Sequence, residues 1–176
     1  MPCYPELFRK YRRGDIFVET GTETGHGCIV ALAAGFKKIY SGDIQDQSYP
    51  SGRVFYDVPE VELFKMHSPD FLKHVIRKIN EGKADMTNRP PILFWLDAHG
   101  SHETPILEEL EVMKGIFQNG DVIMIDDMRI FRAHNEWAKV VFEEHVLEAV
   151  KKLGVTSITY EPDRWDPRDI LVGMQV

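Results

Sequence analysis

The stretch that decides the fold runs from residue 15 to residue 27 and reads Asp-Ile-Phe-Val-Glu-Thr-Gly-Thr-Glu-Thr-Gly-His-Gly. Its first half is a short apolar run, which predicts a buried strand that ends at Gly21. Its second half is rich in glycine, which lets the backbone turn sharply and approach a ligand closely. The residues that follow predict a helix over 25–34, with Gly35 as its C-terminal cap.

The same alternation of short apolar runs and amphipathic stretches continues along the chain. Further strands are expected over 38–42, 61–65, 92–96, 122–125, 156–160 and 170–176, and helices are expected after residue 68, after residue 104 and over 135–153. This order predicts an α/β fold with a Rossmann-like open sheet, mostly parallel, with helices on both faces and an antiparallel C-terminal strand, in three αβα layers. No boundary divides the sequence, so we expect one domain over 1–176.

Composition limits the class of protein. Hydrophobic residues make up 43% of the chain and charged residues 28%, which is ordinary for a globular protein. No run of 18 apolar residues occurs, so we expect no membrane-spanning helix and no membrane partner. The N-terminus lacks a signal-peptide pattern, and Cys3 and Cys28 cannot form a disulfide framework, so a cytoplasmic location is expected. The 21 basic and 28 acidic residues give a net charge of −7, which disfavours a nucleic-acid partner.

Polar residues follow four of the predicted strands at the points where the strands end. Ligands of open α/β sheets bind beyond the carboxyl ends of the strands, so these residues should lie along one edge. The four ends are Glu19-Thr-Gly21, Gly42-Asp43, Leu96-Asp97-Ala-His99 and Ile125-Asp126-Asp127. One or two acids would be background, whereas four such ends predict a binding site.

Two of these ends have structural alternatives. The glycine spacing G-x-x-x-G-x-G fits neither the NAD fingerprint nor a P-loop, and a tight strand-to-helix turn would explain it without a ligand. Asp43, at the end of the second strand, is well placed to accept hydrogen bonds from ribose hydroxyls. Aspartate is also a common turn residue, so both roles stay open for Asp43.

The run Phe17-Val-Glu19-Thr-Gly21-Thr-Glu-Thr-Gly25-His-Gly27, followed by Ala31-Leu-Ala-Ala, resembles motif I of the class I S-adenosylmethionine-dependent methyltransferases. It is most similar to the small metal-dependent O-methyltransferases of the catechol type, and sugar-modifying O-methyltransferases share the acidic arrangement. The resemblance covers nearly the whole chain in element order. It implies that the chain binds S-adenosyl-L-methionine through Glu19, Gly21, Thr22, Gly25, Asp43, His67, Ser68 and Asp97.

Within that set the resemblance assigns different parts of the cofactor to different residues. Glu19 and the glycine turn would surround the methionine part, and Asp43 would hold the ribose. His67 and Ser68 would contact the adenine. For Ser68 an alternative is open, because Ser68-Pro69-Asp70 also has the pattern of a helix N-cap followed by a first-turn proline and acid.

The resemblance also implies a metal centre at Asp97, Asp126 and Asp127. Three carboxylates would form a hard oxygen site, suited to Mg²⁺ or another divalent cation. Such a cation would bind a substrate hydroxyl and lower its pKa. The alternative is that Asp126 and Asp127 cap backbone amides and are neutralised by Arg129 or Arg132.

One position departs from the catechol type, which carries a lysine three residues after the fourth-strand aspartate. Here that position is Gly100, and the nearest candidate base is His99, with His102 behind it. A histidine near its ordinary pKa can act as a general base. The alternative for both is a solvated loop histidine. His99 and Asp97 are therefore the predicted catalytic residues.

The sequence therefore predicts a methyltransferase that transfers the methyl group of S-adenosylmethionine to a hydroxyl oxygen of a small molecule, aided by a divalent cation. A metal-dependent phosphoesterase is the first alternative, with two ions held by Asp97, His99, Asp126 and Asp127. That alternative leaves the glycine turn and Asp43 without a role. The second alternative is a non-catalytic module that binds the cofactor. The sequence leaves open the methyl acceptor, the identity of the metal and whether the chain forms a homodimer.

Overall fold

The computed structural model describes residues 4–45, 55, 57–81, 89–99, 104–132, 141–163 and 165–176. The strands are β1 (Ile16–Thr20), β2 (Lys38–Asp43), β3 (Val61–Lys65), β4 (Ile92–Leu96), β5 (Val122–Ile125), β6 (Ser157–Glu161) and β7 (Ile170–Met174). The helices are α1 (Pro5–Tyr11), α2 (His26–Ala34), α4 (Ser68–Asn80), α5 (Ile106–Met113), α6 (Met128–Arg132) and α7 (Glu143–Lys151).

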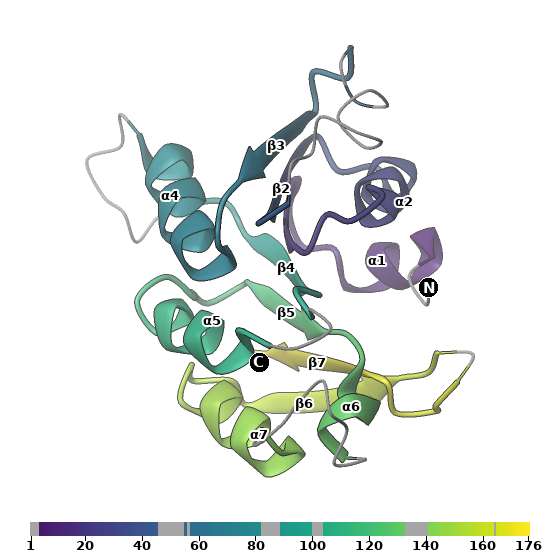
Figure 1. Cartoon of the computed structure of the whole chain (residues 1–176), viewed down its shortest axis with the longest axis vertical. Coiled ribbons are helices and arrows are strands. Elements are labelled where there is room, and N and C mark those ends of the chain that lie inside the picture. Colours follow the sequence, from purple (N-terminus) through teal and green to yellow (C-terminus); the bar gives the residue numbers. More distant parts are fainter. Residues whose placement is uncertain are drawn as a thin grey trace.

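The strands form a seven-stranded sheet in the order β3-β2-β1-β4-β5-β7-β6, with helices on both sides (Figure 1). The pairs among β1 to β5 are parallel, whereas β7 runs antiparallel to both β5 and β6. This arrangement confirms the predicted fold. The chain moves outward from β1 through β2 to β3 and then returns to place β4 on the other side of β1. The β1–β4 pair is therefore the switch point of the sheet, where such folds bind ligands at the carboxyl edge.

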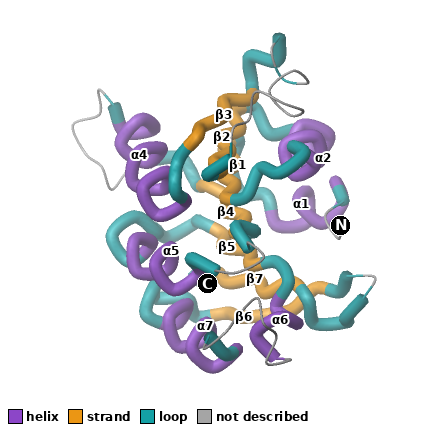
Figure 2. The backbone as a smooth tube through the Cα atoms, in the orientation of Figure 1, coloured by secondary structure: helices purple, strands orange, loops and turns teal. Residues whose placement is uncertain are grey.

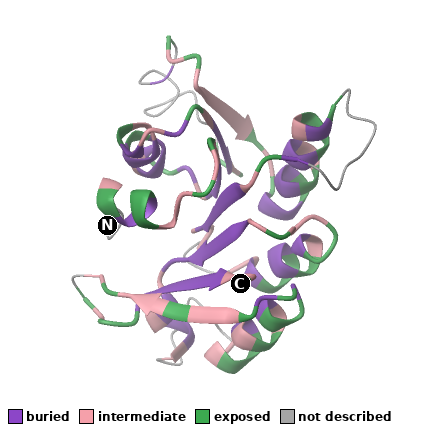
Figure 3. Ribbon diagram, turned by 180° about the vertical axis from the view of Figure 1, so that it is seen from behind, coloured by how far each residue is buried: buried purple, intermediate pink, exposed green. Residues whose placement is uncertain are grey.

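Alternating side chains of the strands fill two separate cores. Figure 2 shows the sheet as a central layer, with α1 and α2 on one side and α4, α5 and α7 on the other. Phe17 and Trp95 lie in the core beneath α1 and α2, whereas Val18 and Phe94 lie in the core beneath the other helices. The central strands are buried, and the edge strand β6 is only partly covered (Figure 3). The double burial explains why 92–96 and 122–125 are apolar throughout.

Three helices differ from the sequence-based expectation. The element order expected from the sequence includes neither α1 nor α6. Phe8 of α1 is fully buried, with its ring 5.2 Å from that of Trp95. The helix predicted over 135–153 is described as α7, which begins at Glu143, and residues 133–140 lie outside the described part. Among the described helices, none has the length and apolar character that a membrane span requires.

Candidate functional site

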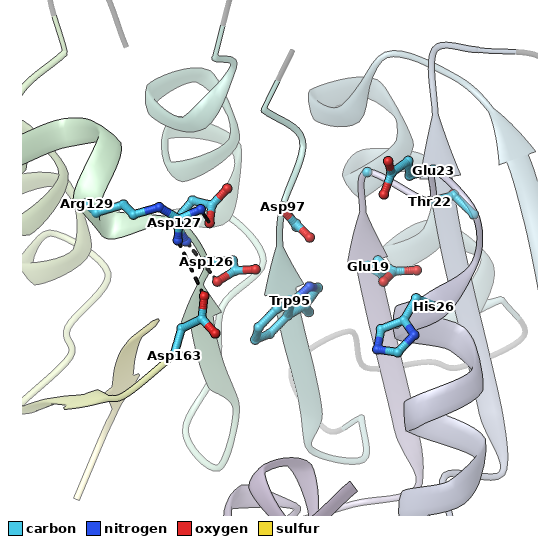
Figure 4. A pocket seen from close by; sticks show the side chains of 12 residues that line it. Glu19, Thr22, Glu23, His26, Trp95, Asp97, Asp126, Asp127, Arg129 and Asp163 are labelled. Carbon is cyan, nitrogen blue, oxygen red and sulfur yellow. Dashed lines mark hydrogen bonds and ion pairs between the residues drawn. The ribbon is translucent and has the colours of Figure 1, made fainter. Parts of the chain in front are cut away.

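A cavity of about 170 Å³ opens at the carboxyl ends of β1, β4 and β5 (Figure 4). Its lining residues are Glu19, Gly21, Thr22, Glu23, His26, Gly27, Trp95, Asp97, Asp126, Asp127, Arg129 and Asp163. One wall is the turn between β1 and α2, and the opposite wall is formed by the residues that follow β5. Asp97 lies between the two walls. The cavity therefore lies at the switch point of the sheet.

The turn between β1 and α2 depends on glycine for its packing. Gly21 has a φ of 85°, and a Cβ atom there would lie 2.2 Å from the backbone oxygen of Asp97. A Cβ atom on Gly27 would lie 1.7 Å from Oε1 of Glu19. Only glycine allows the turn to approach β4 and the carboxyl group of Glu19 so closely. The motif thus forms the tight strand-to-helix turn that was its structural alternative, and the same turn forms a wall of the cavity.

Glu19 is a buried carboxyl group on that wall. Its Oε2 accepts a hydrogen bond from Ser41 Oγ at 2.6 Å and one from Cys28 Sγ at 3.2 Å. The hydroxyls of Ser41 and Thr22 are 2.7 Å apart. Burial raises the pKa of Glu19 to about 7, although the hydrogen bonds from Ser41 and Cys28 oppose the rise. A cationic group bound in the cavity would favour the ionised form of Glu19.

Asp43 connects the end of β2 to the glycine turn. Its Oδ2 accepts a hydrogen bond from the backbone N–H of Glu23 at 3.0 Å, and its Oδ1 accepts one from the N–H of Gln45 at 2.9 Å. Asp43 thus stabilises the turn, which is one of the two roles that the sequence left open. Each carboxylate oxygen can accept a second hydrogen bond, so the geometry leaves capacity for ribose hydroxyls.

His67 and Ser68 lie away from the cavity lining, at the start of α4. The N-cap of α4 is His67, and Ser68 is its first helical residue, so the alternative that made Ser68 the N-cap is wrong. Ser68 is buried, as is the carboxyl group of Glu109 on α5. Burial raises the pKa of Glu109 to about 7, and the Ser68 and Thr20 hydroxyls moderate the rise.

Carboxyl groups from three strand ends gather at and beside the opposite wall. Asp97 follows β4, and Asp126 and Asp127 follow β5, as the sequence predicted. Asp163 and Asp169 were not predicted. They precede β7, whose first residues pair with the last residues of β5 because the two strands are antiparallel. In an antiparallel strand the residues at this edge come before the strand, and an acid-rich stretch before the final strand was the available signal.

The carboxyl group of Asp126 is buried and that of Asp97 is partly buried, and both lie close to other acids. Burial raises the pKa of Asp97 well above its ordinary value, and the negative charges of Asp126 and Asp127 raise it further. Burial and the charge of Asp127 do the same to the pKa of Asp126. Asp127 has a φ of 54°, a left-handed backbone that is unusual for aspartate and often occurs at functional sites. Its N–H donates to Oδ1 of Asp126 at 2.8 Å.

Within the described residues, two groups of side chains have the spacing of metal ligands. One contains Asp97, His99 and Asp127, and the other contains Asp126, Asp127 and Asp169; within each group the ligand atoms lie within 4.8 Å of one another. Asp127 belongs to both groups, whereas the predicted partners Asp97 and Asp126 fall in different ones. Carboxylate oxygens are the ligands that Mg²⁺ and Mn²⁺ prefer. The donor set fits a divalent cation.

Arg129 supplies positive charge to the same wall. Its guanidinium is 2.7 Å from Asp127, contacts Asp169 and lies 3.6 Å from Asp163. Arg129 therefore neutralises Asp127, as the structural alternative predicted. Arg132 instead donates to the backbone oxygen of Arg168 and lies 3.5 Å from Asp166.

His99 lies behind the carboxyl groups and outside the cavity lining. Its Nε2 is 3.1 Å from the backbone oxygen of Asp126, and its Nδ1 is 3.5 Å from Thr104 Oγ1. A carbonyl oxygen can only accept a hydrogen bond, so Nε2 carries the proton and the lone pair is on Nδ1. Burial lowers the pKa of His99, which keeps the imidazole neutral and able to accept a proton or a metal ion. His102 lies outside the described residues.

Comparisons with known proteins address the fold. No protein-family model matches the sequence, and no curated protein is detectably similar to it. Solved structures do match, and they include methyltransferases bound to S-adenosylmethionine or S-adenosylhomocysteine. The chain has the methyltransferase fold.

Three of these structures show the range of the likeness. The O-methyltransferase TomG from Streptomyces achromogenes, solved with S-adenosylmethionine, has a TM-score of 0.65 and 12% identity over 97% of this chain and 76% of its own. The methyltransferase MycE, solved with Mg and S-adenosylhomocysteine, has a TM-score of 0.63 and 14% identity, and the match covers 97% of this chain and 47% of MycE. An rRNA methylase from Streptococcus thermophilus has a TM-score of 0.59 and 21% identity over 100% of this chain and 99% of its own.

Proposed function

We propose that the protein is an S-adenosylmethionine-dependent methyltransferase that methylates a hydroxyl group of a small molecule with the aid of a divalent cation. The observation that carries this proposal is the cavity at the switch point. It places a glycine turn with a buried carboxyl group opposite a wall of carboxylates, in a fold shared with methyltransferases.

The first wall suits the methionine end of the cofactor. The first-turn N–H groups of α2 have no acceptor within the helix, and helix N-termini bind carboxylates. The carboxylate of Glu19 would pair with the methionine ammonium group. S-adenosylmethionine, when bound, supplies an electrophilic methyl group that the acceptor oxygen takes in exchange for its proton. The cavity of about 170 Å³ is smaller than a typical ligand site of roughly 300–1,000 Å³. The adenosine would therefore extend along the sheet edge, toward Asp43, His67 and Ser68.

The second wall suits the acceptor. Asp97, Asp126 and Asp127 would hold the cation, and their mutual repulsion gives the site its preference for positive charge. A divalent cation, when bound, lowers the pKa of a hydroxyl that coordinates it. Asp97 lies between the walls, so it would position the acceptor beside the cofactor. His99, whose Nδ1 carries the lone pair and lies 3.5 Å from Thr104 Oγ1, would take the hydroxyl proton.

Three observations favour methyl transfer to a small molecule over the other candidates. A phosphoesterase with two ions would need both carboxylate groups open, but Arg129 already contacts Asp127 and Asp169. It would also leave the glycine turn and Asp43 without a ligand. A nucleic-acid acceptor fits poorly with a net charge of −7 and an acidic cavity wall.

Cofactor binding is tested by calorimetric titration of S-adenosylhomocysteine into the wild type, Asp43→Ala and Asp57→Ala. Asp57 is an exposed aspartate and serves as the control. We expect micromolar binding to the wild type and the control, weakened about tenfold or more in Asp43→Ala because the ribose loses a charged acceptor. Absence of binding to the wild type contradicts the proposal.

Turnover is tested with labelled S-adenosylmethionine, Mg²⁺ or Mn²⁺, and a panel of catechols and hydroxylated sugars. We expect methyl transfer that requires the cation and is lost in Asp97→Asn. Cofactor affinity without turnover on any acceptor would favour a non-catalytic module. Hydrolysis of a generic aryl phosphate without cofactor binding would favour the phosphoesterase.

A further inference from the structure

We propose that the guanidinium of Arg129 takes the place of a second metal ion beside Asp127 and Asp169, so that the protein binds one divalent cation and not two. This inference deepens the proposed function, since it rests on a cation being bound at Asp97, Asp126 and Asp127. It adds a specificity-determining role for an arginine that touches neither the cofactor turn nor β4.

The two ligand groups form a pattern suited to a pair of ions. Asp97 and His99 belong to one group, Asp169 belongs to the other, and Asp127 is shared by both. Paired metal sites hold their ions about 3.5–4 Å apart, commonly with a carboxylate between them. The wall therefore has ligands for two neighbouring cations, with Asp127 as the bridge.

One of these two positions already contains a cation. The guanidinium of Arg129 lies 2.7 Å from Asp127 and contacts Asp169, which are two members of the second group. Figure 4 shows Arg129 on the outer side of this wall, near Asp127 and Asp163 and away from Asp97. A planar guanidinium that binds two carboxylates occupies the place of a second ion and supplies one positive charge there.

Arg129 is held in this position by its backbone as well as its side chain. Its N–H donates to Oδ1 of Asp169 at 3.0 Å, and the N–H of Met128 donates to the backbone oxygen of Asp169 at 2.8 Å. These bonds fix the start of α6 against the residue before β7. The side chain is only 35% exposed. Displacing the guanidinium would therefore leave Asp169, a fully buried carboxylate, without its charge partner.

The charges of the wall agree with a single additional cation. Among the described residues that line it, Arg129 is the one cation beside Asp97, Asp126, Asp127 and Asp163. Its ion pairs go to Asp127, Asp163 and Asp169, and among the described residues it forms none with Asp97 or Asp126. The remaining demand for positive charge is thus on the side nearest the cofactor turn, where the acceptor would bind.

The experiment is a titration with Mn²⁺ alone, followed by the loss of the free-ion electron paramagnetic resonance signal. The variants are Arg129→Met and Arg129→Gln, which remove the charge, and Arg129→Lys, which keeps it. Arg132→Met is the matched control, because Arg132 is on the same short helix and makes its contacts outside the cavity. We expect one Mn²⁺ per chain in the wild type, Arg129→Lys and Arg132→Met, and two in Arg129→Met and Arg129→Gln.

Each outcome bears on a different claim. Two ions in the wild type overturn the inference, and so does one ion of unchanged affinity in both neutral variants. No Mn²⁺ bound to the wild type overturns the cation in the proposed function and this inference with it, while S-adenosylhomocysteine binding still tests the cofactor site. If the neutral variants unfold without metal, restoration of their far-ultraviolet circular dichroism by Mn²⁺ supports the inference, and failure to restore it opposes the inference.

Discussion

Two aspartates at opposite ends of β5 show how the same residue type has two kinds of environment in this protein. Asp121 precedes the strand and Asp126 follows it, and both are buried. Asp121 forms a bidentate pair with Arg89 and accepts hydrogen bonds from the N–H groups of Ile92 and Gln118, both at 2.9 Å. Asp126 accepts a hydrogen bond from its neighbour Asp127 and lies among like charges.

The difference shows that burial alone does not mark a functional acid. At the amino end of the strand, every oxygen of Asp121 has a donor, so the carboxylate stabilises the fold. At the carboxyl end, charge repulsion is left in place where a ligand would relieve it, which is typical of functional sites. Arg9 and Arg12 also stabilise the fold, because they donate hydrogen bonds to the last carbonyl groups of α2.

The largest effect is expected from breaking the satisfied pair. Asp121→Asn leaves the charge of Arg89 buried without its counter-charge, so we expect a loss of about 3–5 kcal/mol in the free energy of unfolding, measured in urea. Asp15→Asn is the control, since its pair with Arg12 is exposed and the change should stay below about 1 kcal/mol. Equal effects of the two substitutions would refute the structural role of Asp121.

Glu109 tests a buried acid that has no cationic partner among the described residues. Its pKa of about 7 lies above the ordinary value of 4.5, so the native state holds its proton more tightly than the unfolded state. Its contribution to stability is present below pH 4.5 and is lost as the pH rises to about 7. We expect Glu109→Gln to raise the free energy of unfolding at pH 8 by up to about 3 kcal/mol relative to the wild type, with little difference at pH 4. The exposed Glu108→Gln should change neither value, and a pH-independent effect of Glu109→Gln would be inconsistent with this account.

Gly27→Ala tests the packing of the turn against Glu19. Alanine normally stabilises a helix relative to glycine by about 1 kcal/mol, but here its Cβ atom would lie 1.7 Å from Oε1 of Glu19. We therefore expect a loss of roughly 1–3 kcal/mol by thermal unfolding. Gly115→Ala, whose Cβ atom would have ordinary contacts, should change stability by less than about 1 kcal/mol. A stabilised Gly27→Ala would contradict the close approach.

The smallest effect on stability is expected at the other end of β5. Asp126→Asn removes one of several repelling charges, so the free energy of unfolding should stay within about 1 kcal/mol of the wild type or rise. Mn²⁺ affinity should nevertheless fall by about tenfold or more, because a ligand is lost. A large loss of stability with unchanged Mn²⁺ affinity would mean that Asp126 is a structural acid like Asp121.

The sequence predicts the fold well because both faces of the central strands are covered, so 92–96 and 122–125 are apolar from end to end. It also places Asp97, Asp126 and Asp127 together, since parallel strands end at the same edge. The sequence does not reveal Asp163 and Asp169, because their approach depends on the antiparallel direction of β7. The short α6 has too few residues for a periodic pattern, and the position of Arg129 depends on the hydrogen bonds of Asp169.

The most direct test of the central claim asks which end of the sheet binds the cofactor. Backbone amide resonances would be followed by ¹H–¹⁵N nuclear magnetic resonance during a titration with S-adenosylhomocysteine. We expect saturable shifts at Gly21, Gly27 and Asp43, and unchanged signals at Gly14, Gly120 and Asp121 at the opposite end. Absence of shifts, or shifts confined to the opposite end, would contradict a cofactor site at the carboxyl edge.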